Sequence, residues 1–213
     1  NEQMKESTSS DIEGNYWQGH NIQVCTPEDA VMHQPINFNL EKGHTLWVRG
    51  LSGIGKSSLM RVLCGTWEWF HGSMVPAQGK LLSVVQTPYI PNGTLHGALS
   101  YPSNTLMPRE RCVEALRKVA LEHLIDSLDT DDTWQLRLSG GERQRMALAR
   151  VWVHQPEWIF MDEPTSALDA STEEAVLTAL HEYQQSSNCG IFVISHRDIQ
   201  HKLANISVIH VEK

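Results

Sequence analysis

The sequence lacks several features that define common functional classes. It has no apolar run as long as a membrane-spanning helix, and we expect no signal peptide in its polar first residues. Its four cysteines form no C-x-x-C pair, which argues against a zinc knuckle or a disulfide framework and favours a reducing, cytosolic setting. Basic residues are scarce, with 17 Lys and Arg against 25 Asp and Glu and a net charge of −8. This acidic balance argues against a nucleic-acid partner, whose usual footprint is a basic face.

What is present suffices for one large domain, or one domain with a subdomain, since 40% of the 213 residues are apolar. Residues 1–18 are polar and rich in Ser near their start, which is typical of a linker or tail. We therefore expect a tail at 1–18 and a folded domain at 19–213. Because the chain begins at Asn1 rather than Met, we also expect it to be part of a longer protein.

Strands and helices are expected to alternate through the folded part. Alternating or continuous apolar runs predict strands, and apolar residues three and four apart predict helices. Strands are expected at 20–24, 36–40, 44–50, 81–86, 157–162, 190–196 and 206–212. Helices are expected at 56–65, at 109–125, after the glycines at 140–141, and at 172–185 behind a capping box of Ser171 and Glu174. This alternation predicts an α/β fold, a mostly parallel sheet with helices on both faces.

The segment GLSGIGKSS, residues 50–58, matches the phosphate-binding pattern G-x-x-x-x-G-K-[ST] between an expected strand and an expected helix. Glycines let backbone N–H groups wrap phosphates, Lys56 reaches the β- and γ-phosphates, and the Ser57 hydroxyl binds Mg²⁺. The alternative is a Gly-rich turn that arose by chance, which requires strand, loop, lysine and helix to fall in order by coincidence. The expected nucleotide-binding residues of this P-loop are Gly50, Ser52, Gly53, Gly55, Lys56, Ser57 and Ser58.

A second apolar run, WIFMDEP, ends in two carboxylates. Ligands of open α/β folds bind at the carboxyl edge of the sheet, so Asp162 and Glu163 are expected beside the P-loop. Asp162 would hold Mg²⁺ through water, and Glu163 would polarise the attacking water. The alternative, a solvated Asp-Glu pair in a turn, is weakened by the P-loop. We expect the same edge to hold four other polar residues that end strands or follow a turn, namely Gln86, Asp169, Ser195 and His196.

The stretch LRLSGGERQRMALAR, residues 136–150, places a serine and two glycines ahead of a helix. Its apolar residues Met146, Ala147, Val151 and Val153 predict a buried face. Bare amides and a hydroxyl at a helix N-terminus make an anion site, but Ser-Gly is also a common helix cap. The residues alone leave both interpretations open.

In this order, the P-loop, Gln86, LSGGERQR, WIFMDEP, SALD and ISH resemble an ATP-binding cassette (ABC) ATPase domain from about residue 20 to the end. The resemblance implies a P-loop NTPase core with a small antiparallel β part and a helical subdomain at about 87–152. It implies Mg²⁺-dependent ATP hydrolysis, with ATP and Mg²⁺ as cofactors and Glu163, His196 and Lys56 as catalytic residues. Gln86 would contact Mg²⁺ and couple to a transmembrane part, and His196 would hold the γ-phosphate.

The same resemblance implies a partner. The family signature LSGGERQR, residues 138–145, would contact the γ-phosphate of ATP held by a second ATPase domain, in an ATP-dependent head-to-tail dimer. The residues that would face this second domain are Ser139, Gly140, Gly141 and Asp169.

A narrower resemblance, carried by SLMRVLCGTWEW, QTPYIPNGTLHGALSYP, Trp134 and SHR, is to peroxisomal fatty-acyl-CoA half-transporters and their bacterial relatives. It implies a membrane domain fused upstream of Asn1 and a place on the cytoplasmic face of a membrane, here the bacterial inner membrane. One departure is the stretch CTPEDAV, residues 25–31, where most ABC ATPases stack an aromatic residue on adenine. Tyr16 and Trp17 are expected to pack or link rather than to replace it.

Two other functions compete with transport. Soluble ABC ATPases of DNA repair, chromosome maintenance or translation usually carry coiled-coil insertions, zinc knuckles or two cassettes, whereas this chain has one cassette and a compact run from Gln86 to Leu138. A regulatory nucleotide-binding module without turnover is disfavoured because the expected catalytic residues are present. The leading interpretation is an ATPase domain that drives a membrane transporter.

Overall fold

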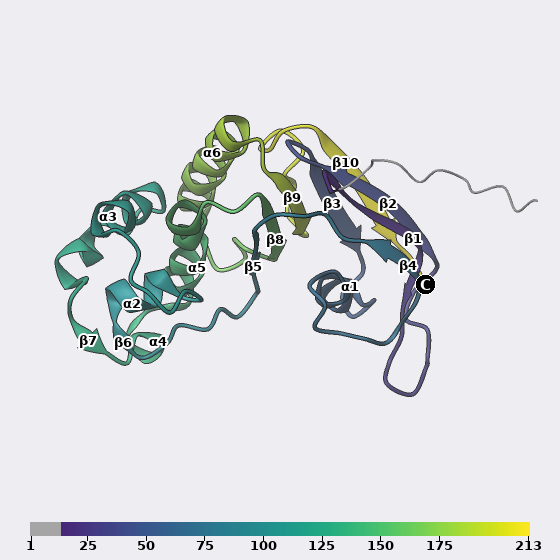
Figure 1. Ribbon diagram of the computed structural model, residues 1–213, viewed down its shortest axis with the longest axis horizontal. Helices are drawn as coiled ribbons and strands as arrows, with labels where there is room; N and C mark the ends of the chain where they lie inside the picture. Colours follow the sequence, from purple (N-terminus) through teal and green to yellow (C-terminus); the bar gives the residue numbers. More distant parts are fainter. Residues whose placement is uncertain (1–13) are drawn as a thin grey trace, which may run out of the picture.

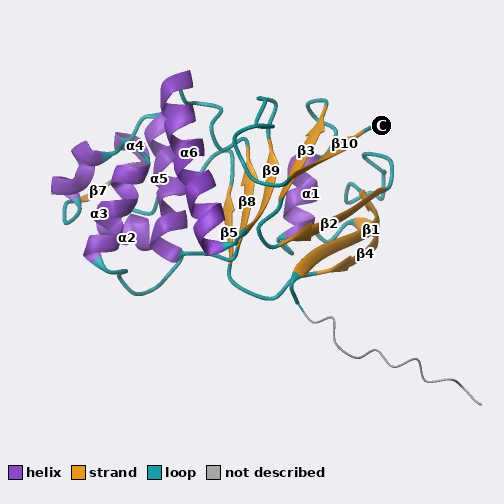
Figure 2. Ribbon diagram, turned by 90° about the horizontal axis from the view of Figure 1, so that it is seen from above, coloured by secondary structure: helices purple, strands orange, loops and turns teal. Residues whose placement is uncertain are grey.

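The computed structural model describes residues 14–213 and has two main sheets and a group of helices (Figure 1). Five parallel strands form one sheet in the order β10-β3-β9-β8-β5, and three antiparallel strands form another in the order β2-β1-β4. Helix α1 lies between the two sheets, and α5 and α6 cover the other face of the parallel sheet (Figure 2).

The strands are β1 (Tyr16–Val24), β2 (Ile36–Glu41), β3 (Thr45–Gly50), β4 (Phe70–Val75), β5 (Leu81–Val84), β6 (Gly93–Thr94), β7 (Asp131–Asp132), β8 (Trp158–Asp162), β9 (Gly190–Ile194) and β10 (Ile206–Val211). The helices are α1 (Lys56–Leu63), α2 (Leu95–Ser100), α3 (Arg109–Lys118), α4 (Trp134–Arg137), α5 (Gly140–His154) and α6 (Ala170–Ser187), with a 3₁₀ helix at Glu122–Ser127. The sequence predicted seven of these strands but missed β4, β6, β7 and the short helices α2 and α4.

Strand β8 shows why the parallel sheet is buried on both faces. Ile159 and Met161 pack into the core cluster formed with α5 and α6, whereas Trp158 and Phe160 pack into the cluster formed with α1 and the antiparallel sheet. Successive strand residues point to opposite faces, so a strand covered on both sides is apolar throughout. The predicted α/β fold, with its parallel sheet and smaller antiparallel part, is confirmed.

The helix expected at 109–125 is wrong in its second half. Helix α3 ends at Lys118, and Ala120 adopts a left-handed conformation with φ of 55°. The Leu121 N–H donates to the Leu116 carbonyl at 2.9 Å and the Ala120 N–H donates to the Arg117 carbonyl at 3.2 Å, which is the Schellman pattern of a helix end. Glycine is the usual residue at this position, so Ala120 gave no sequence signal that the helix ends here.

The capping box of Ser171 and Glu174 is also wrong. Helix α6 begins at Ala170, and its N-cap is Asp169, whose carboxylate accepts the N–H groups of Ser171 and Thr172. The aspartate caps better because its ionised oxygens accept several N–H and hydroxyl groups of the first turn at once. Helix α5 begins at Gly140, so the two glycines lie in its first turn rather than ahead of it, and its N-cap is Ser139, as one of the two interpretations predicted.

The folded part starts earlier than the expected boundary at residue 19, because β1 begins at Tyr16. The Trp17 indole is buried and packs against Phe160 with ring centroids 5.1 Å apart, which stabilises this early start. Tail residues 1–13 lie outside the described residues. Within 14–213, none of the helices has both the length and the apolar character required to cross a bilayer.

Candidate functional site

The P-loop joins the end of β3 to the start of α1, and two of its glycines are required by geometry. A Cβ on Gly50 would lie 2.6 Å from the Val211 carbonyl oxygen of the neighbouring strand. Gly55 is the N-cap of α1 and has φ of 99°, which L-residues with a side chain rarely adopt. The loop therefore approaches β10 closely and turns sharply into the helix.

Lys56 begins α1 and is buried. Its ammonium donates to the carbonyl oxygens of Gly50 at 2.9 Å and Leu51 at 2.8 Å, so it lies across the loop. Burial lowers the pKa of Lys56, and the carboxylates of Glu163 and Asp162 oppose this shift. The loop thus holds a cation next to two anions.

A cavity of about 330 Å³ lies at the carboxyl ends of the parallel strands. Predicted site residues from four segments converge on it. These segments are the P-loop, the end of β8, the stretch after β5 that contains Gln86, and the stretch after β9 that contains His196. Those that line it are Ser52, Gly53, Gly55, Lys56, Ser57, Ser58, Gln86, Asp162, Glu163 and His196. The structure brings these residues together, and their individual roles stay predictions.

Glu163 is held in a strained position at the cavity wall. Its φ is 48°, a left-handed value that costs about 1–3 kcal/mol in a residue other than glycine. The His196 N–H donates to Glu163 Oε1 at 3.2 Å, and the His196 imidazole Nε2 lies 3.6 Å from the same oxygen. Such strain persists where surrounding contacts over-determine the backbone, and it is concentrated at functional sites.

The signature segment lies outside this cavity. Ser139 caps α5 in a capping box with Glu142, whose Oε2 accepts the Ser139 N–H at 2.9 Å and its hydroxyl at 2.7 Å. His123 lies 2.9 Å from the other oxygen of Glu142. The helix-cap interpretation is therefore confirmed. The contact with a second domain's phosphate stays a prediction for Ser139, Gly140 and Gly141.

The capping box predicts a pH dependence of stability. Partial burial acts to raise the pKa of Glu142, but hydrogen bonds from Ser139 and the contact with His123 lower it from 4.5 to about 2. Because folding lowers this pKa, ionised Glu142 stabilises the fold at pH values above the pKa of 4.5 that it has in the unfolded chain. This stabilisation is lost as the pH falls towards 2. The wild-type advantage over Glu142→Gln in free energy of unfolding should shrink by roughly 1–2 kcal/mol between pH 7 and pH 3, measured by denaturant titration. A constant difference between the two proteins would contradict this role of Glu142.

Asp169 is another predicted site residue that lies outside this cavity. It lies at the start of α6, away from the lining of the cavity, and its carboxylate is occupied by the first turn of that helix. Hydrogen bonds from Ser171 and Thr172 hold the pKa of Asp169 well below its usual range. Its contact with a second subunit stays a prediction.

Four residues of the site region were missed. Met32 lines the cavity, Glu142 completes the cap, and Gln144 and Arg197 hold the turn that follows Glu163. Only Glu142 carried a sequence signal, since Ser followed by Glu three residues later is a capping box. The others act through tertiary contacts that no local pattern encodes.

A second, open cavity of about 930 Å³ adjoins the first and shares Met32, Ser52, Gly53 and His196 with it. Among the described residues, no Phe, Tyr or Trp lines either cavity. Trp17 lies in the core, as expected from its packing role, and Trp67 donates from its indole to the Cys25 carbonyl. Residues 25–31 lack the aromatic residue that stacks on adenine in most ABC ATPases, and neither Trp17 nor Trp67 is placed to substitute for it.

Comparisons with known proteins identify the family. Residues 33–166 match the family model described as ABC transporter. The chain is 35% identical over 188 residues to ATP-binding cassette sub-family D member 3 of Mus musculus, covering 83% of this chain and 28% of that protein. It is 33% identical over 184 residues to the inner membrane ABC transporter ATP-binding protein YddA of Escherichia coli, covering 84% of this chain and 32% of that protein.

A solved structure agrees with the fold. The structure of a bacterial Atm1-family ABC exporter with ATP bound matches with a TM-score of 0.81 and 23% identity, covering 100% of this chain and 41% of that chain. The chain spans less than a third of the length of the curated relatives named above.

Proposed function

Because the chain belongs to the ABC transporter family, we propose that it is a nucleotide-binding domain that binds and hydrolyses ATP to drive transport by a membrane transporter. The convergence of Lys56, Gln86, Asp162, Glu163 and His196 on one cavity carries this proposal. These residues come from separate segments, and each supplies a group that phosphoryl transfer uses. The soluble ABC ATPases of DNA repair, chromosome maintenance or translation lose support, because the family model is described as ABC transporter and the Escherichia coli relative is named as an inner membrane ABC transporter ATP-binding protein.

The lining of the cavity supports a site for a nucleoside triphosphate with Mg²⁺. The Ser57 hydroxyl, the Gln86 amide and the Asp162 carboxylate offer the hard oxygen donors that Mg²⁺ prefers. When bound, Mg²⁺ would neutralise charge on the phosphate oxygens. Lys56 binds the β- and γ-phosphates after leaving its two loop carbonyls, and Glu163 accepts a proton from the attacking water.

Two partners follow from this proposal. One is a second ATPase domain, which reaches the signature segment in a head-to-tail dimer. The other is a membrane domain, fused upstream of Asn1 as in the subgroup that the motifs resemble. The resulting transporter would place this chain on the cytoplasmic face of the bacterial inner membrane. Support comes from the Escherichia coli relative, which is named as an inner membrane ABC transporter ATP-binding protein, and from the small share of each relative that this chain covers, 32% in Escherichia coli and 28% in Mus musculus.

Nucleotide binding tests the proposal directly. The chain should bind ATP more tightly with Mg²⁺ than with EDTA, and Lys56→Ala should weaken binding by about tenfold or more because it removes the cation from the phosphate cradle. Isothermal titration calorimetry measures both. The matched control is Lys118→Ala, which removes a partly exposed lysine of α3 that pairs with Glu182 of α6, outside the cavity. Equal ATP affinity in Lys56→Ala and wild type would overturn the proposed function.

A further inference from the structure

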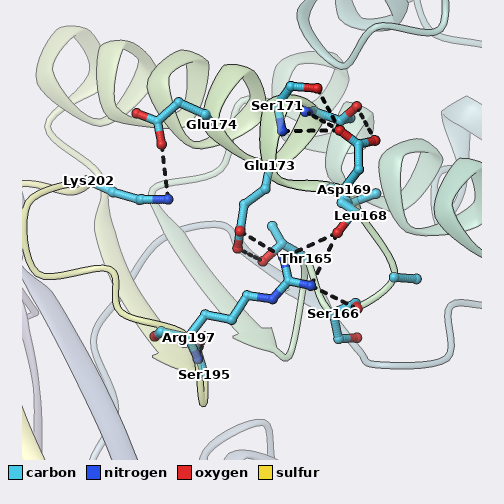
Figure 3. A network of polar contacts seen from close by, with 12 residues as sticks. Thr165, Ser166, Leu168, Asp169, Ser171, Glu173, Glu174, Ser195, Arg197 and Lys202 are labelled. Carbon is cyan, nitrogen blue, oxygen red and sulfur yellow. Dashed lines mark hydrogen bonds and ion pairs between the residues drawn. The ribbon is translucent and has the colours of Figure 1, made fainter.

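Arg197 directly follows His196, and its guanidinium lies against the turn that leads from Glu163 to α6 (Figure 3). Nη1 and Nη2 each donate to the Leu168 carbonyl oxygen at 3.2 Å, and Nη2 also donates to the Ser166 carbonyl oxygen at 3.3 Å. One side chain from the segment after β9 therefore binds two carbonyls of the turn at residues 166–169.

A buried carboxylate fixes this guanidinium in place. Arg197 Nη1 donates to Glu173 Oε2 at 2.7 Å, and the Thr165 hydroxyl donates to the other oxygen of Glu173 at 2.7 Å (Figure 3). Glu173 is only 6% exposed, and Thr165 only 3%. A charge at this depth needs an opposite charge and hydrogen bonds, which Arg197 and Thr165 supply.

The same turn is held from another direction by the signature helix. Gln144 of α5 is buried, and its Nε2 donates to the Ser166 hydroxyl at 2.9 Å. Its Oε1 accepts the Ala167 N–H at 2.9 Å. The turn thus links α5 to the segment that carries His196, and it leads directly into Asp169.

We propose that Arg197 is a positioning residue that couples His196 to the turn at residues 166–169, and through it to the face that Asp169 presents to a second ATPase domain. The inference rests on the proposed function. His196 and Arg197 are adjacent, and the Arg197 N–H donates to the Ser195 hydroxyl at 3.0 Å, so we expect this short segment to move as one piece. A displacement of His196 by bound phosphate therefore moves the guanidinium and the carbonyls that it holds. Arginine is required because its planar fork binds the carboxylate and both carbonyls together.

The test is Arg197→Lys in the 213-residue chain. Lysine keeps the charge that Glu173 needs but cannot bind both carbonyls, so the variant should fold and its ATP affinity should stay within about twofold of wild type. Its kcat for MgATP hydrolysis should fall about two- to 30-fold, the range of couplings carried by residues that touch neither ligand. In the wild type, added MgATP should shift the backbone amide NMR signals of Ala167 and Leu168, and in Arg197→Lys these shifts should shrink.

Lys202→Met is the matched control, because Lys202 lies on the same segment and pairs with Glu174, the neighbour of Glu173 on α6, at 3.0 Å (Figure 3). It should leave kcat and both amide shifts unchanged. If Arg197→Lys is unstable, Glu173→Gln replaces it. The expected result is the same, a lower kcat with nearly unchanged ATP affinity. A wild-type kcat in Arg197→Lys, or a parallel loss of ATP affinity, would overturn the positioning role. Failure of the wild type itself to bind ATP would instead overturn the proposed function.

Discussion

Glu163→Gln is expected to lower the rate of MgATP hydrolysis by roughly 10²–10⁴-fold, the usual contribution of a general base, while ATP binding is retained. Glutamine has the same shape and keeps an oxygen that accepts the His196 N–H, as Glu163 Oε1 does at 3.2 Å. It cannot accept the proton of the attacking water. The substitution therefore removes the chemistry and leaves the strained turn in place.

Phosphate release at saturating ATP measures the rate, and calorimetry measures binding. Glu182→Gln is the matched control, since it makes the same change on an exposed residue of α6. It should turn over at the wild-type rate. Turnover near the wild-type rate in Glu163→Gln would remove Glu163 from the role of general base. A simultaneous loss of ATP affinity would show that the residue holds the nucleotide instead.

The fold and the position of the site could be predicted because their signals are local. Apolar strands such as β8 alternate with helices, and parallel strands bring their carboxyl ends to one edge, so Lys56 and Asp162 had to lie close together. The P-loop pattern also fixes its own structural context, since the lysine must open a helix that follows a strand.

What could not be predicted depends on contacts between distant segments or on unusual local geometry. Arg197 and Gln144 lie in different elements and both bind the turn at residues 166–169. No sequence pattern around either residue predicts this contact. Ala120 ends α3 in a conformation that usually requires glycine, so the sequence predicted one continuous helix. Asp169 is the N-cap of α6 because its charged carboxylate binds the first turn of the helix. The sequence pattern at Ser171 and Glu174 had instead predicted that the helix begins at residue 172.

Ser139→Arg is expected to abolish an ATP-dependent dimer. Ser139 lies at the N-terminus of α5 and outside the cavity that contains Lys56, so its own chain's phosphates do not reach it. We therefore expect a second copy to bring the γ-phosphate to the amides and hydroxyl of this helix end, where the helix dipole favours an anion. An arginine side chain would fill the space between the helix end and that phosphate.

Light scattering with ATP and Mg²⁺ measures the dimer, in a Glu163→Gln background that prevents hydrolysis. Ser186→Arg is the matched control, because it makes the same change at an exposed serine near the end of α6, and it should dimerise normally. Normal dimers in Ser139→Arg would show that the signature segment is not a phosphate site.

In the monomer, Glu142 Oε2 accepts both the N–H and the hydroxyl of Ser139, so an incoming phosphate must displace this carboxylate. If the predicted contact is right, the Ser139 hydroxyl is released from its own cap only when a second copy supplies an anion of higher charge, and dimer formation should depend on bound ATP.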